Sequence, residues 1–195
     1  MFLGLVVACI VQILGTWHLG WPPVLVPHPR LHISYPMLAL SFTVIFATGA
    51  IDDVFQLKPK QKLAGQVLAA LIACIGGLKI GVIVNPFAPG EIILGWLAYP
   101  ITVIYLVAFT NIINLIDGLD GLACGVSTIS AMTMLVIAIL VSEQQVAIVM
   151  AALAGACLGF MPYNKNPAKM FMGDTGSTFL GYILATYSIQ GLFKY

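Results

Sequence analysis

The fold is decided by residues 92–142, which read IILGWLAYPITVIYLVAFTNIINLIDGLDGLACGVSTISAMTMLVIAILVS. Two uncharged runs, 92–116 and 121–142, are separated only by Asp-Gly-Leu-Asp at 117–120. A helix needs about 20 apolar residues to cross the roughly 30 Å hydrocarbon core of a bilayer. The stretch therefore predicts two membrane-spanning helices that are joined by a short acidic turn.

The same spacing of charges continues outward in both directions. Only 8% of the 195 residues are charged and 61% are hydrophobic, whereas soluble domains carry about 25% charged residues. Seven uncharged runs, of which only 63–78 is short for a span, follow one another: 1–29, 31–51, 63–78, 92–116, 121–142, 144–164 and 175–193. We therefore predict an all-α fold, in which residues 1–195 form a single polytopic membrane bundle of about seven transmembrane helices.

The charges predict how such a bundle is oriented. Alternating spans place 52–62, 117–120 and 164–174 on one side, which carries five lysines: Lys58, Lys60, Lys62, Lys165 and Lys169. The other side carries only Arg30, Lys79 and Lys194. By the positive-inside rule, the first side is cytoplasmic. All five aspartates also fall on that side, where they would form an acidic cluster that calls for cations: Asp52, Asp53, Asp117, Asp120 and Asp174.

Other residue types exclude several classes of function. The net charge of +1 provides no polybasic surface for nucleic acid. The cysteines stand singly in apolar surroundings, so we expect small core residues rather than a zinc site: Cys9, Cys74, Cys124 and Cys157. The histidines are irregularly spaced in one outer loop and do not favour a metal site there: His18, His28 and His32. Gly155 and Gly159 have the spacing of close helix packing.

The first motif with chemical character is GAIDDVFQLKPKQK at 49–62. Asp52 and Asp53 end an apolar run, and three lysines follow them. Adjacent carboxylates repel each other unless a cation, a proton or nearby lysines offset their charge. The motif indicates either a functional site or simple ion pairing.

The second motif is NIINLIDGLDGL at 111–122, in which amide and acidic side chains recur every three residues: Asn111, Asn114, Asp117 and Asp120. Gly118 and Gly121 interrupt a helix, so the backbone can turn here. Amide and carboxylate oxygens bind hard cations such as Mg²⁺. The alternative is an acidic turn whose carboxylates only cap the following helix.

The third motif is YNKNPAKMFMGDTGSTF at 163–179, which places basic, amide, aromatic and acidic groups in one loop. Mg²⁺ usually takes one or two protein oxygens together with substrate phosphates and water. Asn114 and Asp174 are candidates for those oxygens. The surrounding lysines would then neutralise phosphate groups.

Together, and in this order, the three motifs resemble the polyprenyl-phosphate N-acetylhexosamine-1-phosphate transferases of glycosyltransferase family 4, over nearly the whole chain. IINLIDGLDGLACG and NPAKMFMGDTGSTFLG look more like the branch that uses simple UDP-N-acetylhexosamines than the phospho-MurNAc-pentapeptide translocases. The resemblance implies a multi-pass enzyme of the bacterial inner membrane. Such an enzyme would transfer GlcNAc-1-phosphate from UDP-GlcNAc to undecaprenyl phosphate, releasing UMP, as the first membrane step toward teichoic acid, lipopolysaccharide or a related polymer.

The resemblance also implies roles for individual residues. It implies catalytic roles for Asp52, Asp53, Lys62 and Asp117. It implies that Asn114 and Asp174 bind Mg²⁺, with Mn²⁺ as an alternative ion, and that Asp120, Asn164 and Phe171 bind substrate. Asp52 would deprotonate or orient the acceptor phosphate with Asp53 supporting it, and Phe171 would stack on uracil. Asp117 and Asp120 would line the nucleotide pocket.

Members of this family usually carry a further N-terminal span and a later cytoplasmic loop with histidines and arginine. We therefore expect a fragment that is truncated at both ends, and a homodimer is compatible with it. Three alternatives stay open. An aromatic prenyltransferase would place its acids at four-residue spacing, a cation-coupled transporter would place them in mid-span, and a non-catalytic remnant would keep the bundle alone.

Overall fold

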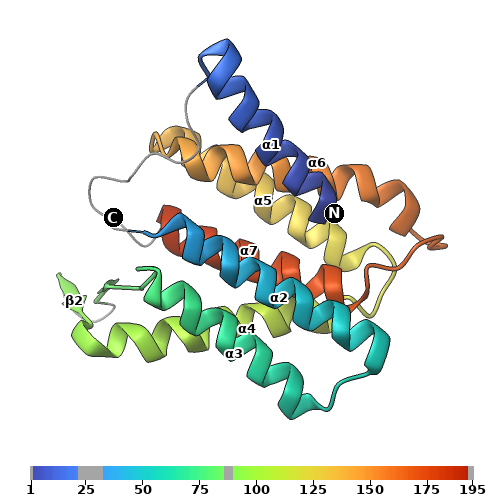
Figure 1. Ribbon diagram of the computed structural model, residues 1–195, viewed down its shortest axis with the longest axis horizontal. Coiled ribbons are helices and arrows are strands. Elements are labelled where there is room, and N and C mark those ends of the chain that lie inside the picture. Colours follow the sequence, from blue (N-terminus) through green and yellow to red (C-terminus); the bar gives the residue numbers. More distant parts are fainter. Residues whose placement is uncertain (1, 22–32, 86–89, 193–195) are drawn as a thin grey trace.

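The computed structural model of the protein describes residues 2–21, 33–85 and 90–192 (Figure 1). Within these ranges the chain forms seven α-helices: α1 (Phe2–Leu19), α2 (Tyr35–Phe55), α3 (Pro59–Ile75), α4 (Ala98–Ile116), α5 (Leu122–Leu140), α6 (Gln144–Asn164) and α7 (Gly173–Leu192). Two short strands, β1 (Val82–Val84) and β2 (Glu91–Ile93), and a 3₁₀ turn, η1 (Gly95–Leu97), precede α4. The predicted helical bundle is confirmed.

Four of the helices are long and apolar enough to cross a membrane, judged by length and composition: α2, α4 together with η1, α5 and α6. α1 contributes a shorter apolar segment, Val6–Leu19. α3 has only 17 residues. The seven predicted spans are thus present as seven helices, and four of them meet the criteria for a membrane span.

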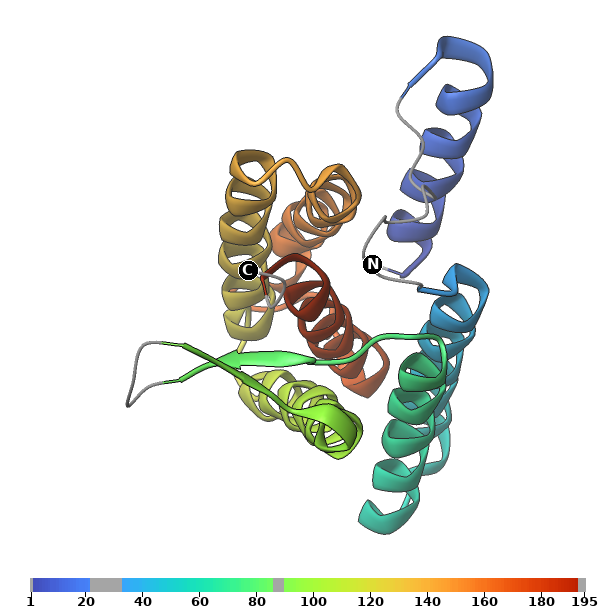
Figure 2. The same ribbon diagram turned by 90° about the vertical axis from the view of Figure 1, so that its left-hand side faces the viewer.

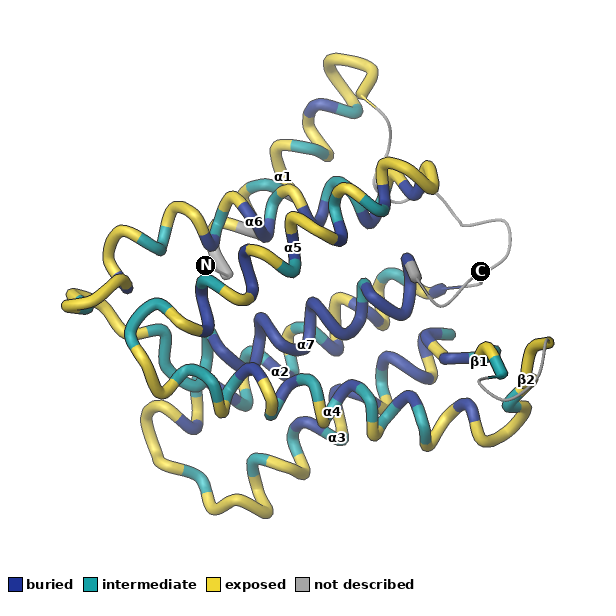
Figure 3. Tube along the Cα trace, turned by 180° about the vertical axis from the view of Figure 1, so that it is seen from behind, coloured by how far each residue is buried: buried dark blue, intermediate teal, exposed yellow. Residues whose placement is uncertain are grey.

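α7 lies in the middle of the bundle, between α4, α5, α6 and the α2–α3 pair (Figure 2). Its residues from Ser177 to Gly191 are buried, except for the half-buried Tyr187 (Figure 3). Because its neighbours shield α7 from lipid, it can carry polar residues such as Thr186 and Gln190, both of which are buried. This explains why the helix is less apolar than a lipid-facing span.

Glycines let α7 approach two neighbours closely. A Cβ at Gly49 of α2 would lie 2.7 Å from the Cα of Thr175, and a Cβ at Gly181 would lie 2.8 Å from the Cα of Thr110 in α4. The sequence predicted close helix packing at Gly155 and Gly159, but a Cβ added at either glycine would meet no atom within 4 Å. That prediction is wrong, because this face of α6 is open where it was expected to pack.

Three connections lie at one end of the bundle: 56–58 between α2 and α3, 117–121 between α4 and α5, and 165–172 between α6 and α7 (Figure 1). α2 stops where Gln56 adopts a left-handed φ of 49°, and Gly121, with φ 75°, precedes α5. The polar segments that the sequence assigned to one side are therefore brought to one end of the bundle.

The hairpin of β1 and β2 lies at the opposite end and was not predicted (Figure 1). Val82 pairs with Ile93 and Val84 with Glu91, in antiparallel register. The uncharged run 92–116 therefore begins in a strand, and its helix starts only at Ala98. Charge spacing alone could not separate these β-branched residues from the helix that follows.

Three of the four cysteines confirm the expectation of small core residues, because they are buried and free: Cys74, Cys124 and Cys157. The side chain of Cys9 is outside the described part of the chain, as are Arg30, Lys194 and two of the histidines, His28 and His32. His18 is exposed in the last turn of α1.

Candidate active site

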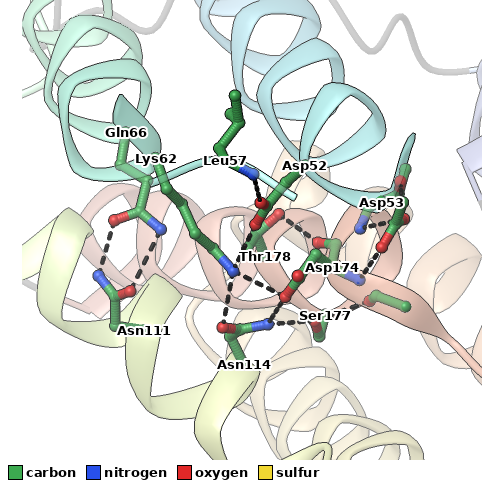
Figure 4. A network of polar contacts seen from close by, with 12 residues as sticks. Asp52, Asp53, Leu57, Lys62, Gln66, Asn111, Asn114, Asp174, Ser177 and Thr178 are labelled. Carbon is green, nitrogen blue, oxygen red and sulfur yellow. Dashed lines mark hydrogen bonds and ion pairs between the residues drawn. The ribbon is translucent and has the colours of Figure 1, made fainter. Parts of the chain in front are cut away.

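The site is built around Lys62, in the first turns of α3, whose side chain is 17% exposed. Its Nζ lies 2.7 Å from Oδ1 of Asp174, 2.9 Å from Oδ2 of Asp52 and 3.1 Å from Oδ1 of Asn114 (Figure 4). An ammonium group has three donors. These three acceptors come from α7, α2 and α4, so one cation joins four helices at this end of the bundle.

Asn114 and Asp174, the two predicted metal ligands, are in direct contact. Nδ2 of Asn114 donates to Oδ1 of Asp174 and, over 2.8 Å, to Oγ of Ser177. Burial opposes ionisation of Asp174, but hydrogen bonds from Lys62 and Asn114 outweigh it and hold its pKa below the ordinary value. The carboxylate is therefore ionised and oriented at neutral pH.

The charge on Lys62 is maintained in the same way. Burial alone would lower the pKa of its ammonium group, but the hydrogen bonds and charges of Asp174 and Asp52 raise it above the ordinary value. Lys62 is thus a permanent cation over the whole physiological range.

The adjacent aspartates Asp52 and Asp53 face different neighbours. Asp52 is 7% exposed, and its Oδ1 accepts a 2.8 Å hydrogen bond from the amide of Leu57 while its Oδ2 meets Lys62. Asp53 accepts hydrogen bonds from the amides of Asp174 (2.7 Å) and Thr175 (2.9 Å) and from the Thr175 hydroxyl. Consecutive helical residues point about 100° apart. The Asp52 carboxylate therefore binds Lys62 of α3, whereas the Asp53 carboxylate binds the first turn of α7.

Asp117 is the C-cap residue of α4, close to these acids. Burial, together with the charges of Asp174 and Asp53, raises the pKa of its carboxyl group to about 6. Carboxylates that repel one another in this way form a site that a divalent cation would stabilise.

The donor set fits Mg²⁺ better than a metal held by protein alone. Among residues 2–21, 33–85 and 90–192, no group of three or more His, Cys, Asp or Glu side chains could hold a metal ion. The oxygens of Asn114 and Asp174 match the one or two hard ligands that Mg²⁺ takes when phosphates and water complete its shell. The residues present therefore fit this ion.

The remaining predicted residues belong to the connection 165–172 or hold it. Oδ2 of Asp120 accepts hydrogen bonds from Nδ2 of Asn166 (3.2 Å) and from the amide of Ala168 (3.0 Å). Asn164 is 3% exposed, and its Nδ2 donates to the carbonyl of Met170 over 3.0 Å. Phe171 is 76% exposed. In the described part of the chain, these residues form no hydrogen bond or ion pair with the Lys62 cluster, which consists of Asp52, Lys62, Asn114 and Asp174.

Sequence reasoning missed Gln66, which is 1% exposed. Its Nε2 donates to Oδ1 of Asn111 (3.2 Å), and Nδ2 of Asn111 donates back to its Oε1 (2.7 Å). The pair lies one turn from Lys62 and Asn114 and joins α3 to α4 (Figure 4). A lone glutamine in the apolar run 63–78 was the available signal, because polar residues in spans face the bundle interior.

Most of this chain is similar in sequence to known proteins. Residues 35–192 match the model of glycosyl transferase family 4. The chain is 44% identical, over 151 residues, to a probable undecaprenyl-phosphate N-acetylglucosaminyl 1-phosphate transferase of Bacillus subtilis (strain 168). The aligned region covers 77% of this chain and 42% of that protein.

Two more distant relatives are named phospho-N-acetylmuramoyl-pentapeptide-transferase. The protein of Halalkalibacterium halodurans is 38% identical over 166 residues (79% of this chain, 51% of that protein). The protein of Moorella thermoacetica is 36% identical over 179 residues (86% and 55%). The chain spans about half the length of the curated relatives it matches. Its apolar helices and these relatives make it a multi-pass membrane protein. Since the match runs from α2 to α7 and includes every residue of the site, the chain belongs to glycosyl transferase family 4.

Proposed function

We propose that this chain transfers GlcNAc-1-phosphate from UDP-GlcNAc to undecaprenyl phosphate, releasing UMP, as a first membrane step in building a cell-envelope polysaccharide. One observation carries the proposal: the Lys62 ammonium is held between Asp52, Asn114 and Asp174 at the end of the bundle. A fixed cation among carboxylate and amide oxygens suits substrates that bring a phosphate, a diphosphate and a metal ion together. The name of the Bacillus subtilis relative supports the choice of sugar and lipid.

Asn114 and Asp174 would hold Mg²⁺, with Mn²⁺ as a substitute. When bound, the ion would neutralise charge on the diphosphate of the donor. Burial raises the pKa of Asp117 to about 6, and the charges of Asp174 and Asp53 add to this, so a bound cation would favour the ionised form of its carboxyl group.

The reaction is a displacement at phosphorus. An oxygen of the lipid phosphate attacks the sugar-bearing phosphorus, the bond from that phosphorus to the oxygen of UMP breaks, and UMP leaves with the electron pair. Lys62 lies where it would stabilise negative charge that develops on the phosphate oxygens. The product is a lipid diphosphate sugar.

Asp52 would act more by positioning than by taking a proton. A phosphate monoester has its second pKa near 6, so it is mostly ionised near pH 7 and needs little base catalysis. The ion pair of Asp52 with Lys62, at 2.9 Å, fits a residue that fixes this lysine for the acceptor phosphate. We propose that Asp117 acts at the nucleotide end of the same site.

Recognition of the nucleotide would fall to the 165–172 connection. Phe171 is 76% exposed, so its ring is free to stack on uracil. Asp120 and Asn164 hold this connection in place. We propose that Asp120 also lines the nucleotide pocket and that Asn164 contacts the substrate.

The site end would face the cytoplasm of a bacterial inner membrane, because lysines gather there: Lys58, Lys60, Lys62, Lys165 and Lys169. The acids lie at helix ends, in contrast to the mid-span acids of a cation-coupled transporter. We also propose that residues 1–195 form a single domain and that two copies can form a homodimer. A non-catalytic remnant is the alternative function, and it predicts no labelled lipid.

The proposal is tested by placing the chain in membranes with undecaprenyl phosphate, Mg²⁺ and UDP-GlcNAc labelled in its sugar. We expect lipid-extractable label and released UMP, and we expect Asp174→Asn to remove both. If neither this chain nor a longer chain that spans the full length of the curated relatives gives labelled lipid from any of several UDP-sugars, the transferase assignment is overturned. Label from a different UDP-sugar would correct the sugar only.

A further inference from the structure

We propose that Asp53 is a positioning residue: it caps the N-terminus of α7 from α2 and thereby orients Asp174, without touching the substrate. The inference deepens the proposed function and rests on it for the role of Asp174. It separates two neighbouring carboxylates that look equivalent in the sequence.

The contacts of Asp53 are those of a helix cap. The first turn of a helix leaves backbone amides without partners inside the helix. Oδ1 of Asp53 accepts the amide of Asp174 at 2.7 Å, and Oδ2 accepts the amide of Thr175 at 2.9 Å. The Thr175 hydroxyl donates to the same Oδ2. Both carboxylate oxygens are therefore occupied by the start of α7.

α7 has no capping side chain of its own at this point. Neither Met172 nor Gly173, which precede Asp174, has a side-chain oxygen that could accept an amide hydrogen bond. Gly173 has φ 68°, and a Cβ there would lie 2.9 Å from Oδ2 of Asp53. The chain thus has glycine where Asp53 comes closest, and the cap is supplied from another helix.

Asp174 is consequently fixed at two points. Asp53 holds its backbone amide, whereas Lys62 and Asn114 hold its carboxylate. The negative charge of Asp53 is also favourable beside the positive end of the α7 dipole. Loss of the cap would loosen the first turn of α7 and the direction in which Asp174 presents its oxygens.

The experiment compares the purified chain with Asp53→Ala and Asp53→Asn, and uses Val54→Ala as the matched control on the same turn of α2. Val54 is exposed, at 71%. Two readouts are needed: amide hydrogen exchange of peptides that cover 172–180, and Mn²⁺ binding followed by electron paramagnetic resonance. Neither readout depends on transfer activity.

We expect Asp53→Ala to speed exchange in 172–180 and to weaken Mn²⁺ binding by roughly tenfold. Asp53→Asn, which keeps one carbonyl acceptor, should give a smaller change of the same kind, and Val54→Ala should match the wild type. Thr175→Ala, which removes only the hydroxyl donor, should also show faster exchange.

Two results would overturn the inference. Unchanged exchange in 172–180 with weakened Mn²⁺ binding would make Asp53 a metal ligand instead of a cap. Unchanged exchange with unchanged binding would leave it no role in placing Asp174. If the wild-type chain itself bound no Mn²⁺, the ion would need the substrate phosphates to bind. The labelled-lipid assay would then test the proposed function, while the exchange data would still decide whether Asp53 caps α7.

Discussion

The Lys62 cluster and the 165–172 connection are held in opposite ways. The cluster joins α2, α3, α4 and α7 through one ammonium group with three acceptors within 3.1 Å. The connection is mostly exposed and is tied down by the side chains of Asp120 and Asn164. The bundle therefore fixes the groups that would meet phosphate and metal, and it leaves the groups that would meet the nucleotide on an open loop.

Lys62→Met should reduce both stability and activity more than any other change, because it removes the ammonium group at the centre of the Lys62 cluster. Removing the ammonium leaves the buried Asp52 unpaired, which costs about 3 kcal/mol of folding free energy for such a pair. We expect transfer activity to fall about 10³-fold. Thermal unfolding and the labelled-lipid assay measure the two losses.

Lys60→Met is the matched control, because Lys60 is exposed two residues earlier in the same helix. It should leave the free energy of unfolding and the activity close to wild type. Equal losses in the two lysine variants would mean that general positive charge, and not the contacts of Lys62, supports the site.

Phe171→Ala should affect nucleotide binding at the 165–172 connection and leave the Lys62 cluster unchanged. Stacking of a base on an aromatic ring contributes about 1–3 kcal/mol, so the KM for the UDP-sugar should rise about fivefold or more. The free energy of unfolding should not change, since the ring is 76% exposed. Phe171→Trp should restore the KM, and a change in kcat with constant KM would contradict a stacking role.

Asp117→Asn should reveal the charge repulsion in the cluster as a dependence of stability on pH. The pKa of Asp117 is raised to about 6 by burial and by the charges of Asp174 and Asp53. The ionised carboxylate therefore destabilises the fold above that pH, whereas the neutral acid does not.

The substitution should stabilise the chain by about 1 kcal/mol at pH 8, allowing for solvent screening. The gain should shrink as the pH falls through about 6 and vanish near pH 4, below which the wild-type acid is protonated in both states. Thermal unfolding at several pH values measures this. A gain that is constant with pH would show that the charge of Asp117 is not its cause.

Asp120→Ala should give the smallest effect. It removes the acceptor of Asn166 and Ala168, at a cost of about 0.5–1 kcal/mol for partly exposed hydrogen bonds. We expect faster amide exchange in 165–172 and a rise of a few-fold in the KM for the UDP-sugar. Asp120→Asn, which keeps one acceptor, should lie between Asp120→Ala and the wild type. A loss of activity as large as that of Lys62→Met would mean that Asp120 acts together with the Lys62 cluster.

The sequence predicted where the connections at the site end lie better than it predicted which helices pack together. Apolar runs that end at charged residues locate the connections 56–58, 117–121 and 165–172, because lipid excludes charge from a span. The three motifs likewise named Lys62, Asn114 and Asp174, which the fold brings into contact.

The rotation of each helix could not be predicted in this way. Nothing in GAIDDVF tells which aspartate meets Lys62 and which meets the start of α7, since that depends on how α2 packs. The pairing of Gln66 with Asn111 depends in the same way on the packing of α3 against α4. The central place of α7 follows from its buried polar residues only once its neighbours are known.

In the proposed reaction a sugar 1-phosphate, and not a sugar alone, moves to the lipid. The most direct measurement uses UDP-GlcNAc labelled with ³²P in its β-phosphate, with undecaprenyl phosphate and Mg²⁺. Attack on the sugar-bearing phosphorus predicts ³²P in the lipid and unlabelled UMP in solution. Label that stays in released UDP while sugar appears on the lipid would instead show transfer of the sugar alone and rule out attack at phosphorus.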